Sequence, residues 1–304
     1  MDSDEAAHAT GGSCERLRVC VGIATRGRPE QLRVVVDRLR LQTLPPSDVV
    51  VSCVSSEDVG ELANRDDVTV VYGSGGAARQ RNVVLRNLPA ETDIVVFFDD
   101  DFFPHPDWLK TVTAAFREDR TIACITGNVI ADGIKGPGLT FEDAMRCLDA
   151  YGTAKSKWVI EDYSPYGCNM AFRRTAIENA WFDERLVLYA WLEDADFGAV
   201  VARGGGRLIK LGTAVGVHLG AKRGRIAGQK LGYSQVMNPA YLRSKSTMTT
   251  YQAVRQVLRN VGSNLVGSIR PEPFVDRRGR LLGNLIAAGD LVRGRLTPER
   301  AESI

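Results

Sequence analysis

Short apolar segments alternate with helical segments over the first 120 residues, and this alternation limits the fold more than any other feature of the chain. Four segments are almost continuously apolar, as expected of strands covered on both faces: 17–24, 48–54, 68–72 and 93–98. Pro29 opens a segment with apolar residues at helical spacing, and 76–88 and 106–116 supply further helices. The pattern predicts an α/β fold with a mostly parallel central sheet, with function at the carboxyl ends of its strands.

The charge of the chain changes sign near residue 220. The whole chain has 39 basic and 37 acidic residues, but residues 221–304 contain 15 basic and only 5 acidic ones. Further strands are expected at 121–129, 166–173 and 207–218, before this change. We therefore predict three parts, with bounds at 1–16 for a flexible N-terminus, 17–220 for the α/β domain and 221–304 for a basic helical extension.

The basic extension contains two stretches with the periodicity of amphipathic helices, one starting at Tyr251 and one covering 281–292. Five arginines flank the second stretch: Arg277, Arg278, Arg280, Arg293 and Arg295. One interpretation is docking on an anionic membrane, and the other is packing on the acidic domain or on a second subunit. No nucleic-acid-binding motif is present.

No apolar run approaches the ~20 residues that span a bilayer, and the N-terminus is polar and acidic where a secretory signal is basic and apolar. We therefore expect a cytoplasmic protein, with a peripheral position on the inner face of the cytoplasmic membrane if the extension binds lipid. The oligomeric state cannot be read from the sequence.

Three consecutive aspartates, Asp99, Asp100 and Asp101, follow directly on the apolar segment 93–98. Three carboxylates at the end of a buried strand repel one another, so they cost stability unless a cation offsets their charge. Because alternate residues of an extended chain point the same way, Asp99 and Asp101 are expected to face one pocket. Their oxygens suit a hard divalent ion, and the competing interpretation is a solvated acidic loop.

A second acidic group, Glu193 and Asp194 in WLEDADF, stands at the start of an expected helix. Acidic residues favour helix N-termini in any case. Near a metal-bound substrate, however, a carboxylate is a natural general base. His218 ends the last expected core strand, where it is either structural or a further metal ligand, and imidazole suits manganese better than magnesium.

A glycine-containing loop at 70–82 leaves open a different class of enzyme. Gly73, Gly75 and Ala78 match the spacing G-x-G-x-x-A after a strand and before a helix, which is the outline of a dinucleotide-binding fingerprint. That fingerprint normally opens the first strand–helix unit, whereas two strands precede this loop. An NAD-dependent oxidoreductase would leave the acidic groups unexplained, and a non-catalytic sugar-binding or membrane-associated protein would need only some of them.

In their order along the chain, these motifs resemble the inverting nucleotide-sugar glycosyltransferases of family 2, which have the Rossmann-like GT-A fold. The resemblance covers residues 17–220. It rests on VGIATRGRPEQL, GGAARQRN, FDDDFFPHPDWL with the D-x-D motif, YGCNMAFRR and WLEDADF. Many relatives of this kind build bacterial exopolysaccharides and other surface polysaccharides.

The resemblance implies roles for individual residues. Asp194 is implied to be the catalytic base, with Glu193 beside it, and Asp101, Asp99 and His218 to hold Mn²⁺ or Mg²⁺. The implied nucleotide-sugar contacts are Thr25, Arg28, Cys53, Arg79, Asn82, Asp99, Asp100 and Asn169. The family commonly has an aspartate at the position of Cys53, where it contacts the base of the nucleotide.

The function implied is transfer of a sugar from a nucleotide-diphosphate sugar, expected to be a UDP sugar, to a hydroxyl of a saccharide acceptor. The acceptor expected from such relatives is linked to a polyprenyl diphosphate. The sugar, the acceptor, the linkage and the choice between manganese and magnesium cannot be read from the sequence.

Overall fold

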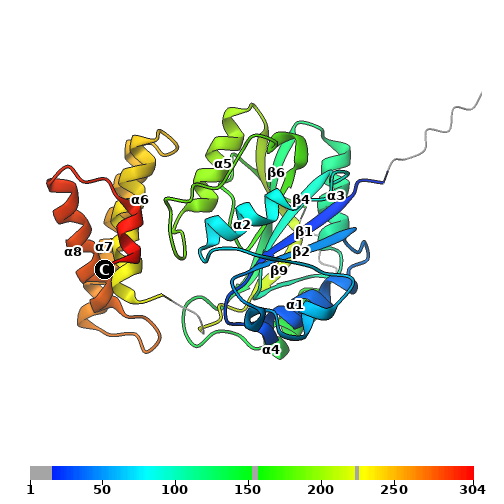
Figure 1. Cartoon of the computed structure of the whole chain (residues 1–304), viewed down its shortest axis with the longest axis horizontal. Helices are drawn as coiled ribbons and strands as arrows, with labels where there is room; N and C mark the ends of the chain where they lie inside the picture. Colours follow the sequence, from blue (N-terminus) through cyan, green and yellow to red (C-terminus); the bar gives the residue numbers. More distant parts are fainter. Residues whose placement is uncertain (1–15, 153–156, 223–225) are drawn as a thin grey trace, which may run out of the picture.

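The computed structural model of the chain describes residues 16–152, 157–222 and 226–304, and Figure 1 shows their arrangement. Within these residues, the strands form one sheet in the order β3-β2-β1-β4-β8-β6-β9-β5, with β7 paired to β9. The predicted flexible N-terminus, 1–16, lies outside the described residues except for its last position.

The first half of the sheet follows the predicted alternation. Its strands are parallel to one another: β1 (Val19–Ala24), β2 (Asp48–Cys53), β3 (Thr69–Tyr72) and β4 (Ile94–Asp99). The connections contain helices α1 (Pro29–Arg40) and α2 (Ala77–Arg86) and two short 3₁₀ turns, Ser56–Asp58 and Gly60–Asn64. Parallel strands joined through helices are the arrangement that the apolar segments and their spacing predict.

The second half of the sheet mixes strand directions. It contains β5 (Phe102–Pro104), β6 (Ile122–Asp132), β7 (Val159–Glu161), β8 (Asn169–Arg173) and β9 (Arg207–His218). Only β6 and β9 pair in parallel here, while β8 is antiparallel to both β4 and β6, and β5 and β7 are antiparallel to β9. The fold class is α/β as predicted, with a sheet that is less parallel past β4 than in its first half.

Helices cover both faces of the sheet, which explains why its inner strands are apolar without alternation. On one face, Val21 and Ile23 of β1 pack with residues of α1 and α3 (Trp108–Glu118). On the other, Cys20 packs with residues of α2 and α5 (Glu193–Arg203). A smaller cluster joins α4 (Phe141–Tyr151) to the end of β9.

The C-terminal extension forms a separate group of helices, seen at the left of Figure 1. It consists of α6 (Gly228–Ser244), α7 (Thr250–Ile269), α8 (Arg277–Val292) and a 3₁₀ segment, Pro298–Glu302. Lys245 at the end of α6 pairs with Asp183 at 2.8 Å and with Asp196 of α5 at 2.6 Å, which joins this group to the sheet domain. None of the helices among the described residues combines the length and hydropathy that a membrane span requires.

Candidate functional site

The three aspartates at the end of β4 separate into two directions. Asp99 and Asp101 each bring a carboxylate oxygen to the imidazole of His218, and the three ligand atoms all lie within 4.8 Å of one another. β5 pairs antiparallel with β9, with Phe102 opposite His218, so the sheet itself carries the imidazole to the aspartates. The sequence predicts this grouping of Asp99 with Asp101, and the antiparallel β5 is what adds the histidine.

Asp100 points away from this group into the protein. It is fully buried, its carboxylate accepts a hydrogen bond from the Thr25 hydroxyl at 2.7 Å, and it pairs with the Arg28 guanidinium at 2.7 Å. Burial raises the pKa of Asp100, and the charge of Arg28 opposes that shift. Thr25, Arg28 and Asp100 therefore brace the loop after β1 against the end of β4.

The carboxylate of Asp101 is held in its charged form. Burial alone would raise its pKa, but the hydrogen bond and charge of His218 and the charge of Arg28 together lower it to about 2. The Asp101 Oδ2 atom accepts from the Ala221 backbone N–H at 2.8 Å, and Arg28 lies 3.3 Å from it. The other oxygen, Oδ1, lies 3.4 Å from His218 Nε2.

His218 is oriented from behind by a residue that the sequence does not single out. Its Nδ1 atom lies 2.9 Å from Asp132 Oδ1, at the end of β6, and the other Asp132 oxygen accepts from the Tyr166 hydroxyl at 2.9 Å. A carboxylate on one ring nitrogen fixes which nitrogen faces the ligand site, here Nε2. The only sequence signal for Asp132 is its place just past the apolar segment 121–129.

Two carboxylates and one imidazole nitrogen match the ligands of Mn²⁺, and the oxygen atoms alone match Mg²⁺. The donor set of Asp99, Asp101 and His218 therefore fits a divalent cation of the kind that the sequence predicts.

Asp132→Asn is expected to weaken Mn²⁺ binding about 10- to 100-fold, because an uncharged amide would hold Nδ1 of His218, and so direct Nε2 toward the ion, more weakly than the carboxylate does. Isothermal titration calorimetry with Mn²⁺ measures this directly. Asp66→Asn, which makes the same change at an exposed position before β3, serves as the control. Equal Mn²⁺ affinity in Asp132→Asn and wild type would show that Asp132 does not orient the ligand.

Arg81 connects the two acidic groups that the sequence presents separately. Its guanidinium is buried, pairs with Asp99 at 3.0 Å, forms a short ion pair with Glu193 and donates to the Gly167 carbonyl at 3.0 Å. Asp194 accepts a hydrogen bond from the Gly167 N–H at 2.8 Å. The start of α5 and the end of β4 thus meet around Arg81. The sequence prediction names its neighbours Arg79 and Asn82 as contacts and does not name Arg81.

Asp194 is half-buried in this cluster. Burial raises the pKa of its carboxyl group, against the effect of hydrogen bonds from the Gly167 and Ala195 N–H groups and the charge of Arg81. The raised pKa of Asp194 is closer to neutral pH, which is where the pKa of an effective general base lies. Glu193, by contrast, is buried and paired with Arg81, which gives it a supporting position.

The loop that leads into Asp194 has an unusual backbone. Leu188, Ala190 and Leu192 have φ values of 60°, 52° and 72°. This is a left-handed backbone conformation that residues other than glycine rarely adopt. The loop is held by hydrogen bonds from Ala77 N–H to the Leu188 carbonyl at 2.9 Å and from Asn238 of α6 to the Trp191 carbonyl at 2.8 Å. Strain of this kind concentrates at functional sites and persists only where the surroundings enforce it.

Arg81→Met is expected to lower the free energy of unfolding by about 3–5 kcal/mol, because it leaves the buried Glu193 carboxylate and the nearby Asp99 without their common cation. Urea unfolding measures the change. The control is Arg86→Met on the same helix, whose ion pair with Glu184 is exposed and is expected to contribute less than about 1 kcal/mol. Equal losses in the two variants would contradict this account of Arg81.

Four of the predicted nucleotide-sugar contacts bond to other groups of the protein or lie in the core. Arg79 pairs with Glu302 at 2.7 Å, and Asn82 bonds to the Phe182 backbone and to Glu184. The Cys53 thiol is fully buried and directed at the Val71 carbonyl, 3.8 Å away. In this structure these side chains bond to other residues of the protein or lie in the core, and their roles as nucleotide-sugar contacts stay predictions.

Asn169, the fourth, lies at the start of β8 and is fully buried. Its side chain donates to the Cys168 Sγ atom at 3.3 Å, and the Cys168 carbonyl accepts from the Asp99 N–H at 3.2 Å. The segment therefore supports the backbone under Asp99, and the role of the Asn169 amide as a ligand contact stays a prediction.

Comparisons with known proteins bear on the family and the fold. A family model described as "Glycosyl transferase family 2" matches residues 20–181, just over half of the chain. No curated protein sequence matches the chain significantly.

Two solved structures resemble the fold. The crystal structure of TarS 1–349 from S. aureus is 16% identical, with 94% of this chain and 83% of that one covered and a TM-score of 0.57. The mannosyltransferase PcManGT from Pyrobaculum calidifontis, in complex with GDP-Man and Mn²⁺, is 17% identical, with 91% and 81% covered and a TM-score of 0.53. At these identities, the two structures support the fold.

Proposed function

The chain belongs to glycosyl transferase family 2 and is a glycosyltransferase, and from this premise we propose that it moves a sugar from a nucleoside-diphosphate sugar to a hydroxyl of a saccharide acceptor with inversion. One observation carries the proposal: the cation ligands Asp99, Asp101 and His218 and the carboxylate Asp194 gather at one edge of the sheet, with Arg81 between the two groups. The first group suits the diphosphate of a donor, and the second suits the proton of an acceptor.

The donor side of the proposed reaction needs positive charge where the diphosphate leaves. Asp99, Asp101 and His218 would hold Mn²⁺ or Mg²⁺, which as a bound Lewis acid offsets negative charge that develops on the leaving group. Arg28, partly exposed beside Asp101, supplies a second positive charge at the same place. Asp132 keeps His218 oriented, and Asp100 holds Arg28 at its position.

The acceptor side needs a base. Asp194 would accept the proton of the acceptor hydroxyl as that oxygen attacks the anomeric carbon from the face opposite the leaving diphosphate, so that one displacement inverts the configuration. Its raised pKa supports this role, and Arg81, fixed by Glu193, keeps positive charge close to it. Asp196, in the same motif, pairs with Lys245 and is therefore not available as the base.

For the donor nucleotide we propose a UDP sugar, as the family resemblance implies. Recognition of the uracil ring cannot use an aspartate at position 53, because that position is the buried Cys53. The nearby Asp58 accepts hydrogen bonds from the backbone N–H groups of Gly27, Val54 and Ser55, so it fixes the loops after β1 and β2. Base recognition is then expected to come from these braced loops.

For the acceptor we propose a saccharide on a polyprenyl diphosphate in bacterial polysaccharide synthesis, reached from the inner face of the cytoplasmic membrane. The basic extension, with 15 basic against 5 acidic residues, supports a position close to anionic lipid. We also propose the division into a catalytic domain at 17–220 and an extension at 221–304, which the family match at 20–181 and the separate group α6–α8 support.

Family membership excludes the oxidoreductase alternative, and the glycine loop has another place in the structure. Gly73 and Gly75 lie between β3 and α2, in the third strand–helix unit of the chain, and Gly76 before α2 has a φ of 123°. Only glycine adopts that backbone conformation readily, so Gly76 is needed for the turn. Gly73 is needed for space, because an added Cβ there would lie 2.7 Å from the Val83 side chain.

The test is a panel of nucleoside-diphosphate sugars, scored by release of the nucleotide with Mn²⁺, with Mg²⁺ and with a chelator. We expect turnover of one donor that depends on the metal and on Asp194. Turnover that is equal in the chelator would contradict the proposed cation site, and turnover only of a donor other than a UDP sugar would correct the nucleotide. No turnover of any donor with any saccharide or lipid-linked acceptor would contradict the proposed reaction.

A further inference from the structure

Most of the large apolar side chains of helix α7 are turned outward, while Val257 and Val261 pack inward against α6 and α8. The residues that it buries are small or polar: Ala253, Asn260, Asn264 and Gly267. The residues that it exposes include the large apolar ones: Tyr251, Val254, Leu258, Leu265, Val266 and Ile269. At 3.6 residues per turn these two sets lie on opposite sides of the helix. A helix of a soluble domain normally has the reverse arrangement.

The inward position of the asparagines has a structural cause in α6. Pro239 has no N–H group, so the carbonyl of Gln235, four residues earlier, lacks its helical partner. The Asn260 amide donates to that carbonyl at 3.3 Å, and the Asn264 amide donates to the Gln235 side chain at 2.8 Å. Turning Leu258 inward would leave these buried polar groups unpaired, which costs more than the burial of one side chain contributes.

Helix α8 repeats the pattern. It buries Gly283, Asn284, Ala287 and Asp290, and it exposes Leu282, Leu285 and Val292. Its backbone is so close to α6 that an added Cβ on Gly283 would lie 2.0 Å from the Gln229 carbonyl oxygen. Close backbone contact leaves no room for large side chains between the two helices. The apolar residues of the second predicted amphipathic stretch are consequently divided, with Ile286 and Leu291 packed inward.

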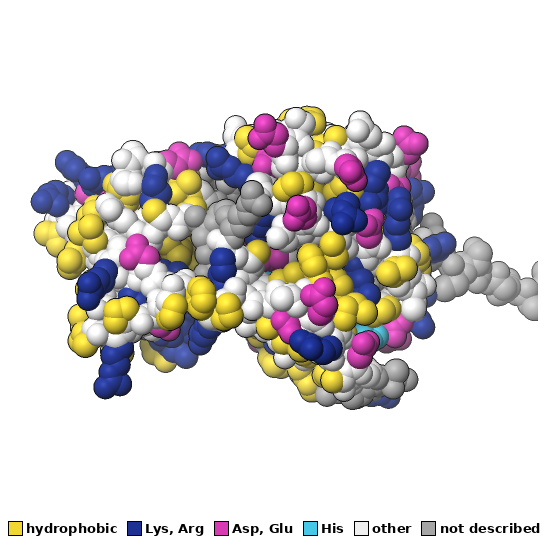
Figure 2. All heavy atoms as spheres, turned by 90° about the horizontal axis from the view of Figure 1, so that it is seen from below, with side chains coloured by type: hydrophobic (Ala, Val, Ile, Leu, Met, Phe, Trp, Pro, Cys, Tyr) yellow, Lys and Arg dark blue, Asp and Glu magenta, His cyan; other side chains and the backbone are white. Residues whose placement is uncertain are grey.

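The outward apolar residues are concentrated on the extension. Ten of the nineteen large hydrophobic side chains that are exposed in the described part of the chain lie between Tyr251 and Val292. Figure 2 shows yellow apolar and dark blue basic side chains interleaved over this group of helices, at the left of the view. Exposed apolar side chains that are concentrated on one part of a protein indicate an interaction surface.

We define the outer face of α7 by its exposed residues: Tyr251, Val254, Arg255, Leu258, Arg259, Leu265, Val266, Ile269 and Arg270. Its charge is of one sign, because no acidic residue occurs between Asp196 and Glu272 in the sequence. Of the acidic residues of the extension, only Glu272 adjoins the end of this face, where it pairs with Arg277. The others make contacts elsewhere: Asp290 with Arg300, Glu299 with Arg185, Glu302 with Arg79, and Asp276 at the start of α8.

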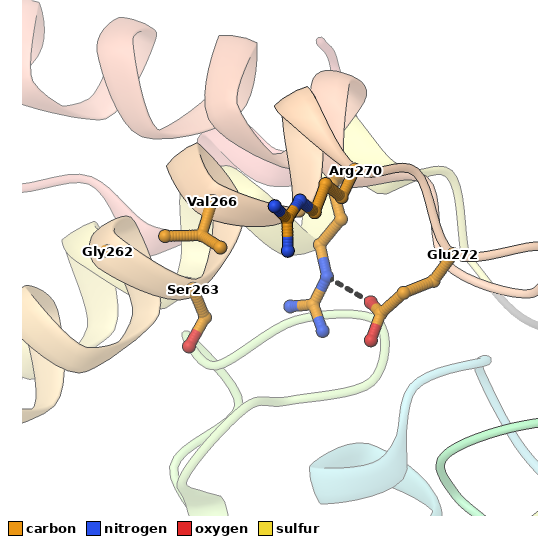
Figure 3. Close-up of a pocket in the computed structure, with 7 residues that line it drawn as sticks. Gly262, Ser263, Val266, Arg270 and Glu272 are labelled. Carbon is orange, nitrogen blue, oxygen red and sulfur yellow. Dashed lines mark hydrogen bonds and ion pairs between the residues drawn. The ribbon is translucent and has the colours of Figure 1, made fainter.

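A groove of about 490 Å³ opens beside the end of this face, between α7 and the segment before α8. Figure 3 shows Ser263, Val266 and Arg270 along α7, with Glu272 across from them, where it pairs with Arg277 at 2.6 Å. Gly262 and Gly267 have no side chains to fill the space. Apolar surface and guanidinium groups thus adjoin at the point where α7 ends.

We propose that the outer face of α7 docks on an anionic lipid bilayer, with its apolar side chains at the boundary of head groups and acyl chains and its arginines at lipid phosphates. Apolar residues flanked by arginine are the composition of helices that lie in the membrane interface. A second copy is a poorer occupant, because a two-fold contact would set this basic face against itself with no acidic partner. Docking would bring the site to a lipid-linked acceptor, and this part of the inference rests on the proposed function.

The experiment is co-sedimentation of the full chain with vesicles of phosphatidylcholine, with and without phosphatidylglycerol. We expect binding to the anionic vesicles that weakens as salt is raised. Arg255→Gln with Arg259→Gln is expected to reduce partitioning about thirty-fold. Leu258→Gln with Ile269→Gln is expected to reduce it at least about tenfold. The matched control, Leu41→Gln, changes an equally exposed leucine at the end of α1 and is expected to have no effect.

All of these side chains are exposed, so the variants should fold, and donor turnover with a soluble acceptor reports on each of them. Equal sedimentation of wild type with both kinds of vesicle at low salt would overturn the proposal, as would unchanged binding of the Leu258→Gln, Ile269→Gln variant. A dimer in light scattering that this variant dissociates, without vesicle binding, would assign the face to a second copy and also overturn it. Vesicle binding needs no sugar transfer, so a failure to bind vesicles would not contradict the proposed reaction. A failure to turn over any donor would likewise not contradict the proposed docking.

Discussion

Replacement of Asp194 by asparagine is expected to reduce sugar transfer by about 10²–10⁴-fold, the contribution typical of a general base. Asparagine keeps the shape of the side chain and can still accept the hydrogen bond from the Gly167 N–H, which in the wild type is 2.8 Å long. It cannot take a proton from the acceptor hydroxyl. The measurement is kcat for nucleotide release with donor, acceptor and Mn²⁺ all saturating.

Donor binding distinguishes a base from a structural residue at this position. The affinity for nucleoside diphosphate with Mn²⁺ is expected to stay near wild type in Asp194→Asn, because the cation ligands Asp99, Asp101 and His218 are unchanged. Asp66→Asn, an exposed aspartate before β3, controls for the loss of one charge. Near wild-type turnover in Asp194→Asn would remove Asp194 from the mechanism, and a parallel loss of donor affinity would make its role structural.

Asp101→Asn is expected to abolish metal-dependent nucleotide binding. Asp101 is the most enclosed of the cation ligands, and although burial opposes this, the hydrogen bond and charge of His218 lower its pKa and favour the charged carboxylate. Loss of a carboxylate that only orients a metal ligand already costs about 10- to 100-fold in metal affinity, so the loss of a ligand is expected to cost more than about 100-fold. Calorimetry with UDP, with and without Mn²⁺, measures both parts of the effect.

Residual binding of UDP without metal gives the control within the same experiment. It is expected to be alike in wild type and Asp101→Asn, since Arg28 remains held by Asp100 at 2.7 Å. If Mn²⁺ strengthens UDP binding equally in the two proteins, the cation site lies elsewhere. If the variant is unfolded by circular dichroism, His218→Gln provides the same test at the opposite ligand.

The sequence predicts the first half of the fold well because each of its strands is buried on both faces and each connection contains a helix, which leaves a direct apolar signal. It does not predict the directions of β5, β7 and β8. These strands are 3 to 5 residues long, and their pairing depends on partners more than 40 residues away. Local patterns contain no information on such pairings.

The candidate site shows the same division. Asp99, Asp101 and Asp194 stand in short motifs whose charge is unusual beside apolar strands, so the sequence singles them out. Arg81 and Asp132 do not stand out, because an arginine on an amphipathic helix and an aspartate past a strand are common. Their importance comes from contacts across 112 and 86 residues, with Glu193 and His218 respectively.

The extension also shows where periodicity stops being informative. The apolar residues of α7 recur as in any amphipathic helix, and that period says that one side is apolar without saying which way it faces. The direction that the apolar side faces follows from Pro239 of α6 and from the two asparagines of α7 that donate hydrogen bonds to Gln235. This is a relation between two helices, and the pattern of a single helix does not contain it.

Helix α6 also connects the extension to the proposed catalytic base, Asp194. Its residue Asn238 donates a hydrogen bond to the Trp191 carbonyl, and Tyr233, Val236 and Met237 pack on Val187. Trp191 and Val187 both belong to the loop with left-handed residues that leads to Asp194. The asparagines of α7 bond to Gln235, one turn before Asn238 on α6. A protein cut after residue 220 would therefore keep every cation ligand and lose the support of its base. Binding of nucleotide and transfer of sugar would become separable by truncation, and any force on α7 at a membrane would reach the base through a single intervening helix.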